Sequence, residues 1–233
     1  TKLRPTREDR RLDREILSEI FTIGLPALGT TFVSCFGYIA FARMVSGMGT
    51  TIFAAHSIAI TAEQIVYIPG YGLRVATSTL VGNALGEKDI RKLKATERVS
   101  ILITLLIMVV NGIGLYLFAY PFMRLFTNSV NAARIGSEML RLVSFSEPFF
   151  GLMIVLEGIS YGMGRTKHVF ACEAVSMWGI RIFGTFLCVN VFGLGLKAVW
   201  LCMIADNICK AILLYIFRPK HVEENADDRG ALR

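Results

Sequence analysis

The length of its apolar runs is the feature that most constrains what this chain can fold into. Six runs of about 20 or more mostly apolar residues follow one another, at 16–46, 52–82, 99–120, 137–161, 168–190 and 195–217. A helix of about 20 residues is long enough to cross the hydrocarbon of a bilayer. Hydrophobic residues make up 54% of the chain, and its mean hydropathy is +0.54. The sequence therefore predicts an all-α integral membrane protein with six transmembrane helices.

The basic residues indicate how these helices are oriented. The N-terminal segment 1–15, the 84–98 loop, the 162–168 loop and the C-terminal tail together hold 17 Lys and Arg residues. The loops that alternate with these, on the other side of the membrane, hold 3 Lys and Arg residues, namely Arg124, Arg134 and Lys197. Because basic loops stay on the cytoplasmic side, we expect both termini in the cytoplasm of a multi-pass inner-membrane protein. The predicted organisation is a basic linker (1–15), a six-helix membrane lobe (16–217) and a polar tail (218–233).

The second run carries a polar stripe. Glu63, Tyr67, Gly70 and Arg74 fall on one helical face, where hydrocarbon would penalise the charged groups. Pro69 removes a backbone hydrogen bond and favours a bend. We therefore predict that this stripe lines an aqueous cavity. The alternative is that the two charged side chains reach the headgroups at the two ends of the helix.

The fourth run contains the carboxylates that best suit reversible ion binding. Glu147 stands next to Pro148 near the middle of this run, and Glu157 follows about three turns later. A buried carboxylate without a cation needs a proton or a metal ion. Glu147 and Glu157 are therefore candidates for proton or sodium coupling. The alternative for Glu147 is a structural, hydrogen-bonded glutamate at a helix kink.

Three further ionisable residues interrupt the last two runs. Arg181 is a candidate cavity or gate cation in the fifth run. Asp206 and Lys210 stand four residues apart in the sixth, a spacing that predicts a structural ion pair within one helix. Pro26 is expected to bend the first run, as Pro69 and Pro148 are expected to bend theirs.

The motifs of enzymes and of nucleotide, metal and nucleic-acid binding proteins are missing from the sequence. It contains no HExxH, Walker or GxSxG motif, and its three histidines are far apart. All five cysteines fall within the predicted spans, without a CxxC motif, as expected for small packing residues. The net charge of +7 is explained better by orientation in the membrane and contact with lipid headgroups than by a nucleic-acid-binding surface. We expect no enzymatic activity, no nucleic-acid partner and no resident metal or cofactor.

Several motifs occur in an order that resembles one transporter family. The segment FAAHSIAITAEQIVYIPGYGLRVATSTLVGNALGEKD (53–89) resembles the eighth-helix signature of multidrug and toxic compound extrusion (MATE) transporters. Further matches are GLP (24–26), LFT (125–127), GISYGMGRTKHVF (158–170), MWGIRI (177–182) and GLGLKAVWLCMIADNICKA (193–211). Together they cover nearly the whole chain.

The resemblance implies a C-terminal lobe of six helices from a transporter of twelve. Such proteins export cationic or amphipathic compounds in exchange for Na⁺ or H⁺, by alternating access of a cavity between two lobes. The implied partners are small-molecule substrates, the bilayer, and an N-terminal lobe or a second copy of the chain. The candidate cavity residues are Glu63, Gln64, Tyr67, Arg74 and Arg181.

The chain departs from the family pattern at positions that bear on coupling. The first span has no carboxylate between Glu19 and its outer end, whereas several branches carry one in the seventh helix that contributes to a cation site. The tenth-helix carboxylate of several branches aligns near Phe150, one turn after Glu147, and Tyr161 replaces a frequent arginine. Three alternatives to a drug antiporter stay open. They are a flippase for lipid-linked precursors in the same superfamily, an oligomeric channel, and a half-transporter that is inactive without its partner lobe.

Overall fold

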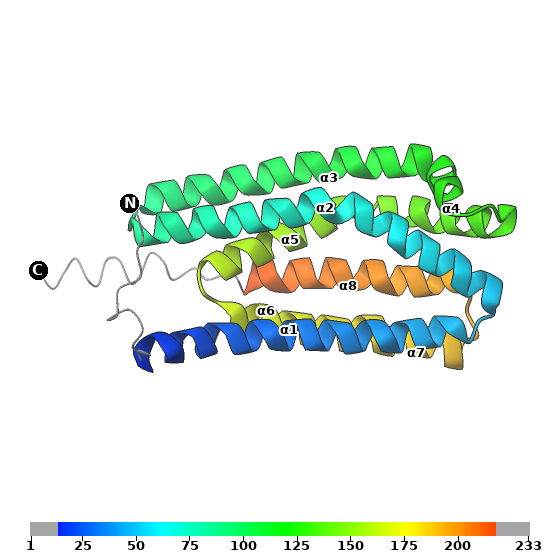
Figure 1. Ribbon diagram of the computed structural model, residues 1–233, viewed down its shortest axis with the longest axis horizontal. Helices are drawn as coiled ribbons and strands as arrows, with labels where there is room; N and C mark the ends of the chain where they lie inside the picture. Colours follow the sequence, from blue (N-terminus) through cyan, green and yellow to red (C-terminus); the bar gives the residue numbers. More distant parts are fainter. Residues whose placement is uncertain (1–13, 218–233) are drawn as a thin grey trace, which may run out of the picture.

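The helices of the computed structural model follow the six apolar runs (Figure 1). The structure describes residues 14–217, so the predicted tail and all but the last two residues of the predicted linker lie outside the described residues. The helices are α1 (Arg14–Ser46), α2 (Thr50–Gly86), α3 (Ile90–Phe126), α4 (Val130–Ser144), α5 (Glu147–Gly162), α6 (Thr166–Ser176), α7 (Phe183–Phe186) and α8 (Leu196–Ile216). Two π-helical segments, η2 (Met177–Ile182) and η3 (Leu187–Val191), flank α7.

The first three helices are longer than the hydrocarbon they would cross. α2 and α3 each have 37 residues, which corresponds to roughly 55 Å against a hydrocarbon thickness of about 30 Å. They therefore tilt or extend beyond the membrane. Five helical segments within 14–217 are long and apolar enough to span a bilayer, and the bent pair α4–α5 makes a sixth span. The six predicted spans are confirmed.

The fourth span differs from the expected single bent helix. α4 ends at Ser144, α5 begins at Glu147, and the two are bent by 61°. Pro148 lies in the first turn of α5, where its missing N–H removes no helical hydrogen bond. Pro148 therefore begins a helix instead of bending one in its middle. The break places the carboxylate of Glu147 at the start of α5.

Pro69 lies within α2, and α3 contributes a polar contact to the turn before it. Pro69 lacks the N–H that would bond to the carbonyl of Ile65 in that turn. The side-chain amide of Asn111 on α3 donates to the neighbouring carbonyl of Val66 at 3.0 Å. This contact supplies a hydrogen-bond donor next to the carbonyl that loses its helical donor at Pro69.

Small residues let α2 and α5 pack closely. Ser78 and Gly82 on α2 lie against Gly162 on α5, and Gly158, one turn earlier on α5, lies against the backbone of Arg74. A Cβ atom at Gly158 would lie 2.7 Å from the carbonyl oxygen of Arg74, so only glycine fits there. This is the small-xxx-small pattern by which membrane helices approach one another. It holds Arg74 and Glu157 at the same crossing.

The packing divides the lobe into a closely packed part and a peripheral helix. α2, α3 and α5 lie together, and α8 runs between them and the α1–α6 pair (Figure 1). α1 packs mainly on α6 and η2, and it leaves Phe21, Leu25 and Phe32 exposed. Exposed apolar side chains of this kind suit contact with lipid or with another lobe.

Candidate functional site

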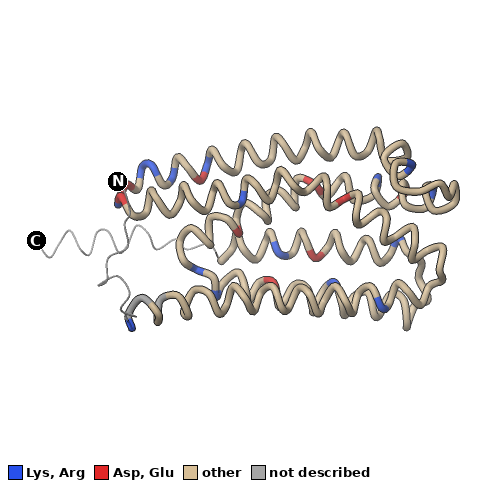
Figure 2. Tube along the Cα trace, in the orientation of Figure 1, with Lys and Arg blue, Asp and Glu red and all other residues tan. Residues whose placement is uncertain are grey.

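Ionisable residues lie midway along the helices as well as at their ends (Figure 2). Eight of those in the middle form one group. They come from α2, α5, α6, η2 and α8, and we call them the buried charge cluster: Glu63, Arg74, Glu147, Glu157, Glu173, Arg181, Asp206 and Lys210. Seven are buried, and the eighth, Arg74, has a side chain that is 32% exposed. An ion buried without a partner costs several kcal/mol, so the pairing within the cluster decides its chemistry.

Two cations and two carboxylates of the cluster neutralise one another between α6, η2 and α8. Lys210 Nζ lies 2.6 Å from Glu173 Oε2 and 3.8 Å from Asp206 Oδ2. Arg181 Nε lies 2.9 Å from Asp206 Oδ2, although the orientation is not that of a linear hydrogen bond. Lys210, predicted to pair within its own helix, therefore lies closer to Glu173 on α6 than to Asp206.

Serine hydroxyls complete this four-residue network. Ser34 on α1 donates to Glu173 Oε1 at 2.5 Å, and Ser176 donates to Asp206 Oδ1. These bonds satisfy carboxylate oxygens that the cations leave free. The network therefore joins α1, α6, η2 and α8 and carries no net charge when all four ions are charged.

Arg74 and Glu157 form a second neutral pair between α2 and α5. Arg74 Nη1 lies 3.0 Å from Glu157 Oε2. The guanidinium also lies over the rings of Tyr71 and Tyr161, at 5.3 Å and 6.0 Å from their centroids. Tyr161, which replaces a frequent arginine of the resembled family, thus contacts an arginine from another helix. Glu157 already has a cation, which makes it less suited to bind a coupling ion than predicted.

Glu63 has a hydrogen bond but no cation. The hydroxyl of Tyr67 donates to Glu63 Oε1 at 2.5 Å, and the Tyr67 ring stacks on Phe150 with a centroid separation of 3.7 Å. Glu63, Tyr67 and Gly70 are all buried. Three of the four residues of the predicted polar stripe are therefore packed inside the lobe, and Arg74 is partly exposed. Gln64 lies on the exposed face of α2.

Glu147 is the one carboxylate of the cluster with no hydrogen-bond partner. It is 0% exposed, and neither Oε1 nor Oε2 has a partner among the described residues. Gly112 of α3 makes room for it, because a Cβ atom there would lie 3.2 Å from Glu147 Cβ. An unpartnered buried carboxylate favours uptake of a proton or a cation.

The charge balance of the cluster points to the same two residues. It contains five carboxylates and three cations, and the three cations are all paired with Glu157, Glu173 and Asp206. The two remaining carboxylates, Glu63 and Glu147, have no Lys or Arg nitrogen within 4.0 Å in the described part of the chain. The cluster therefore has room for up to two further positive charges.

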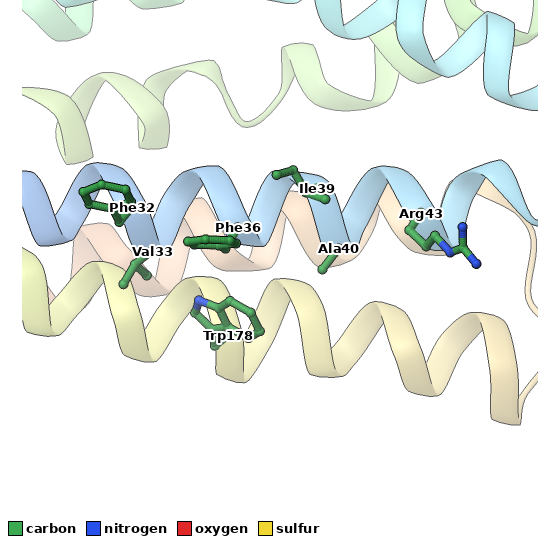
Figure 3. Close-up of a pocket in the computed structure, with 7 residues that line it drawn as sticks. All are labelled: Phe32, Val33, Phe36, Ile39, Ala40, Arg43 and Trp178. Carbon is green, nitrogen blue, oxygen red and sulfur yellow. The ribbon is translucent and has the colours of Figure 1, made fainter.

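An apolar groove on the outside of the lobe lacks such groups. It has a volume of about 560 Å³ and lies between α1 and η2, where Phe32, Phe36 and Trp178 line it and Arg43 marks one end (Figure 3). It contains no carboxylate, so it does not suit a cationic ligand.

Two residues of this interior, Glu173 and His56, are not among the site residues predicted from the sequence. Glu173 stands in the fifth predicted span, and a carboxylate within a span is itself a signal of a partner or a site. Buried His56 accepts a hydrogen bond at Nδ1 from Trp200 Nε1 at 3.2 Å. His56 and Trp200 are 144 residues apart, so no local sequence pattern relates them.

Comparison with known proteins gives the family. The MatE family model matches residues 26–187. The chain belongs to the MatE family. A probable multidrug resistance protein NorM from Thermotoga maritima is 30% identical over 201 residues, which cover 85% of this chain and 43% of that protein. A second probable NorM, from Photorhabdus laumondii, is 28% identical over 86% of this chain and 45% of its own length.

Solved structures show the same fold. The MatE chain superposes on a MOP-superfamily transporter from Pyrococcus furiosus with a TM-score of 0.84 at 22% identity, covering 94% of this chain and 49% of that one. A MATE crystal structure in the bent conformation gives a TM-score of 0.87 at 20% identity, covering 96% and 49%. The chain thus spans about half the length of its relatives, and its fold is one lobe of a twelve-helix MATE-type transporter.

Proposed function

We propose that this MatE chain is the C-terminal lobe of a multidrug efflux antiporter in the inner membrane, with cytoplasmic termini. The transporter exports cationic or amphipathic compounds in exchange for Na⁺ or H⁺, by alternating access between this lobe and an N-terminal lobe. Membership of the MatE family and the NorM relatives support the transport class. The basic loops support the orientation.

The observation that carries the coupling role is the unpartnered carboxylate of Glu147. Its two oxygens are buried without a hydrogen bond, while every other carboxylate of the cluster has a cation or a hydroxyl. Glu147 is therefore the group whose environment changes most when a proton or Na⁺ binds. Glu63 is the second acceptor, since Tyr67 satisfies only one of its oxygens. Arg74, Arg181 and Lys210 neutralise the remaining carboxylates, Glu157, Asp206 and Glu173.

Ethidium efflux tests this proposal. Cells express this chain alone, the chain joined to its N-terminal lobe, or the joined form with Glu147→Gln. We expect only the joined form with Glu147 to pump, because alternating access needs two lobes and coupling needs an acceptor. Glu138→Gln is the matched control, since Glu138 pairs with Lys197 on the exposed surface. It should leave efflux unchanged.

The other outcomes separate the alternatives. Pumping by the lone chain would show that two copies assemble, and would contradict the requirement for an N-terminal lobe. Pumping by the Glu147→Gln form would remove Glu147 from coupling. If all forms reach the membrane and none exports ethidium, cationic drugs are the wrong cargo. A lipid-linked precursor is then the substrate to test.

A further inference from the structure

Two cysteines face each other near one end of the last helical hairpin. Cys188 Sγ on η3 and Cys202 Sγ on α8 are 3.8 Å apart. Both thiols are free and half-buried. Among the other cysteines, Cys35 is exposed and Cys172 is buried, so the expectation that all five are buried packing residues is wrong. Cys188 and Cys202 are instead a matched pair of partly accessible thiols.

The local backbone brings these two sulfurs together. Cys188 belongs to a π-helical turn, whose wider winding turns side chains away from the α-helical pattern. Gly184, one turn earlier, leaves room for the partner, because a Cβ atom there would lie 3.4 Å from Cys202 Sγ. The hairpin between them is short, and Gly193 adopts a φ of 61°, which glycine tolerates best. Interrupted helical winding of this kind often marks a functional position.

We propose that Cys188 and Cys202 form a reversible disulfide, so that this end of the lobe is a redox-sensitive modification site. The sulfurs, 3.8 Å apart, must approach by roughly 1.8 Å to reach the bonding distance of about 2.0 Å. The oxidant is a low-molecular-weight or protein disulfide. One cysteine, as thiolate, attacks a sulfur of this disulfide and releases one thiol. The second cysteine then attacks the mixed disulfide and releases the other.

The sum of the two steps is balanced. Two cysteine thiols are oxidised and lose two protons, and one disulfide is reduced to two thiols that take up those protons. The hairpin lies at the opposite end of the spans from the basic loops, so the proposed orientation places it on the non-cytoplasmic side. Disulfides persist in that compartment.

The position of the bond gives it a consequence for the buried charge cluster. Asp206 follows Cys202 by four residues on α8, and Arg181 precedes Cys188 by seven along the fifth span. A covalent link would tie η3 to α8 beside the Arg181–Asp206 ion pair. Oxidation would thus restrict relative movement of two segments that hold this ion pair.

Thiol counting on the purified full chain tests the proposal. The protein in detergent is treated with glutathione disulfide, denatured, and titrated for free thiols, and its peptides are analysed by mass spectrometry. We expect a Cys188–Cys202 linked peptide and the loss of these two of the five thiols. Cys188→Ser and Cys202→Ser should each abolish the link, and Cys35→Ser should retain it.

Exposed Cys35 serves as the internal control for oxidant access. A glutathione adduct on Cys35 in wild-type protein, with Cys188 and Cys202 both still free, would overturn the proposal. A link between a different pair of cysteines, or a link that survives Cys202→Ser, would overturn it equally. A dithiothreitol-reversible link that joins only Cys188 and Cys202 supports it.

Discussion

Arg74 Nη1 lies 3.0 Å from Glu157 Oε2, so one of the two carboxylates expected to bind the coupling ion already has a cation from another helix. Glu147, ten residues earlier on the same helix, has none. Two glutamates that look alike in the sequence therefore have different chemistry. Glu157 is neutralised across α2 and α5, whereas Glu147 has no hydrogen-bond partner among the described residues.

Removing Arg74 should destabilise the lobe, because Glu157 would remain buried without a cation. We expect Arg74→Ala to lower the free energy of unfolding by about 1–3 kcal/mol, less than for a fully buried pair, since the arginine side chain is 32% exposed. Unfolding by sodium dodecyl sulfate in mixed micelles measures the change. The double variant Arg74→Ala, Glu157→Gln should recover part of the loss. If the double variant is no more stable than Arg74→Ala, the ion pair with Arg74 is not what stabilises buried Glu157.

The Lys210–Glu173 contact should matter more, because both side chains are buried. Lys210→Met leaves Glu173 and Asp206 with one cation between them, and a loss of about 3–5 kcal/mol is expected. The matched control is Lys197→Met, which removes an exposed partner of Glu138 and should cost about 1 kcal/mol or less. Equal losses for the two variants in the same unfolding assay would contradict the network.

The close approach of α2 and α5 depends on Gly158. Gly158→Ala places a Cβ atom 2.7 Å from the carbonyl oxygen of Arg74, so the helices must separate. We expect a loss of about 1–3 kcal/mol and a weaker Arg74–Glu157 pair. Gly72→Ala on α2 meets nothing within 4 Å and controls for the change in helix propensity. Unfolding curves of the two variants should separate clearly.

Gly112 should control the environment of Glu147. A Cβ atom at position 112 would lie 2.7 Å from the carbonyl oxygen of Ser144 and 3.2 Å from Glu147 Cβ. We expect Gly112→Ala to displace the α4–α5 break and to reduce ethidium efflux by the joined transporter. Gly114→Ala, on the same helix in open space, is the control. Unchanged transport in Gly112→Ala would show that this packing does not position Glu147.

The sequence predicts the spans well because their signal is local. Runs of apolar residues and the turn glycines between them locate six passes, and the order of short motifs indicates the family. The sequence predicts a bend at Pro148 within the fourth span, whereas the helix breaks before Glu147, because a proline is compatible with either a kink or a helix start. In this structure Pro148 lies at a helix start, and the close approach of Gly112 to the carbonyl of Ser144 accompanies that start.

The pairing inside the lobe could not be derived from the sequence. Asp206 and Lys210 are related by helical spacing, but Glu173 and Ser34 come from other helices and show no shared pattern. The same holds for Arg74 and Glu157, which are 83 residues apart. Periodicity assigns a residue to a face, while the identity of its partner depends on how the helices cross.

The most direct test of the account measures whether Glu147 holds a proton in the folded protein. Infrared spectra of the purified chain in sodium-free buffer are compared for wild type, Glu147→Gln and Glu157→Gln. We expect wild type and Glu157→Gln to show the carbonyl stretch of a protonated buried carboxyl group, and Glu147→Gln to lack the component of this band that Glu147 contributes, even where Glu63 also holds a proton. Adding Na⁺ should diminish the band if sodium competes for the same site. Identical carbonyl regions in wild type and Glu147→Gln would contradict the central claim that Glu147 is the acceptor.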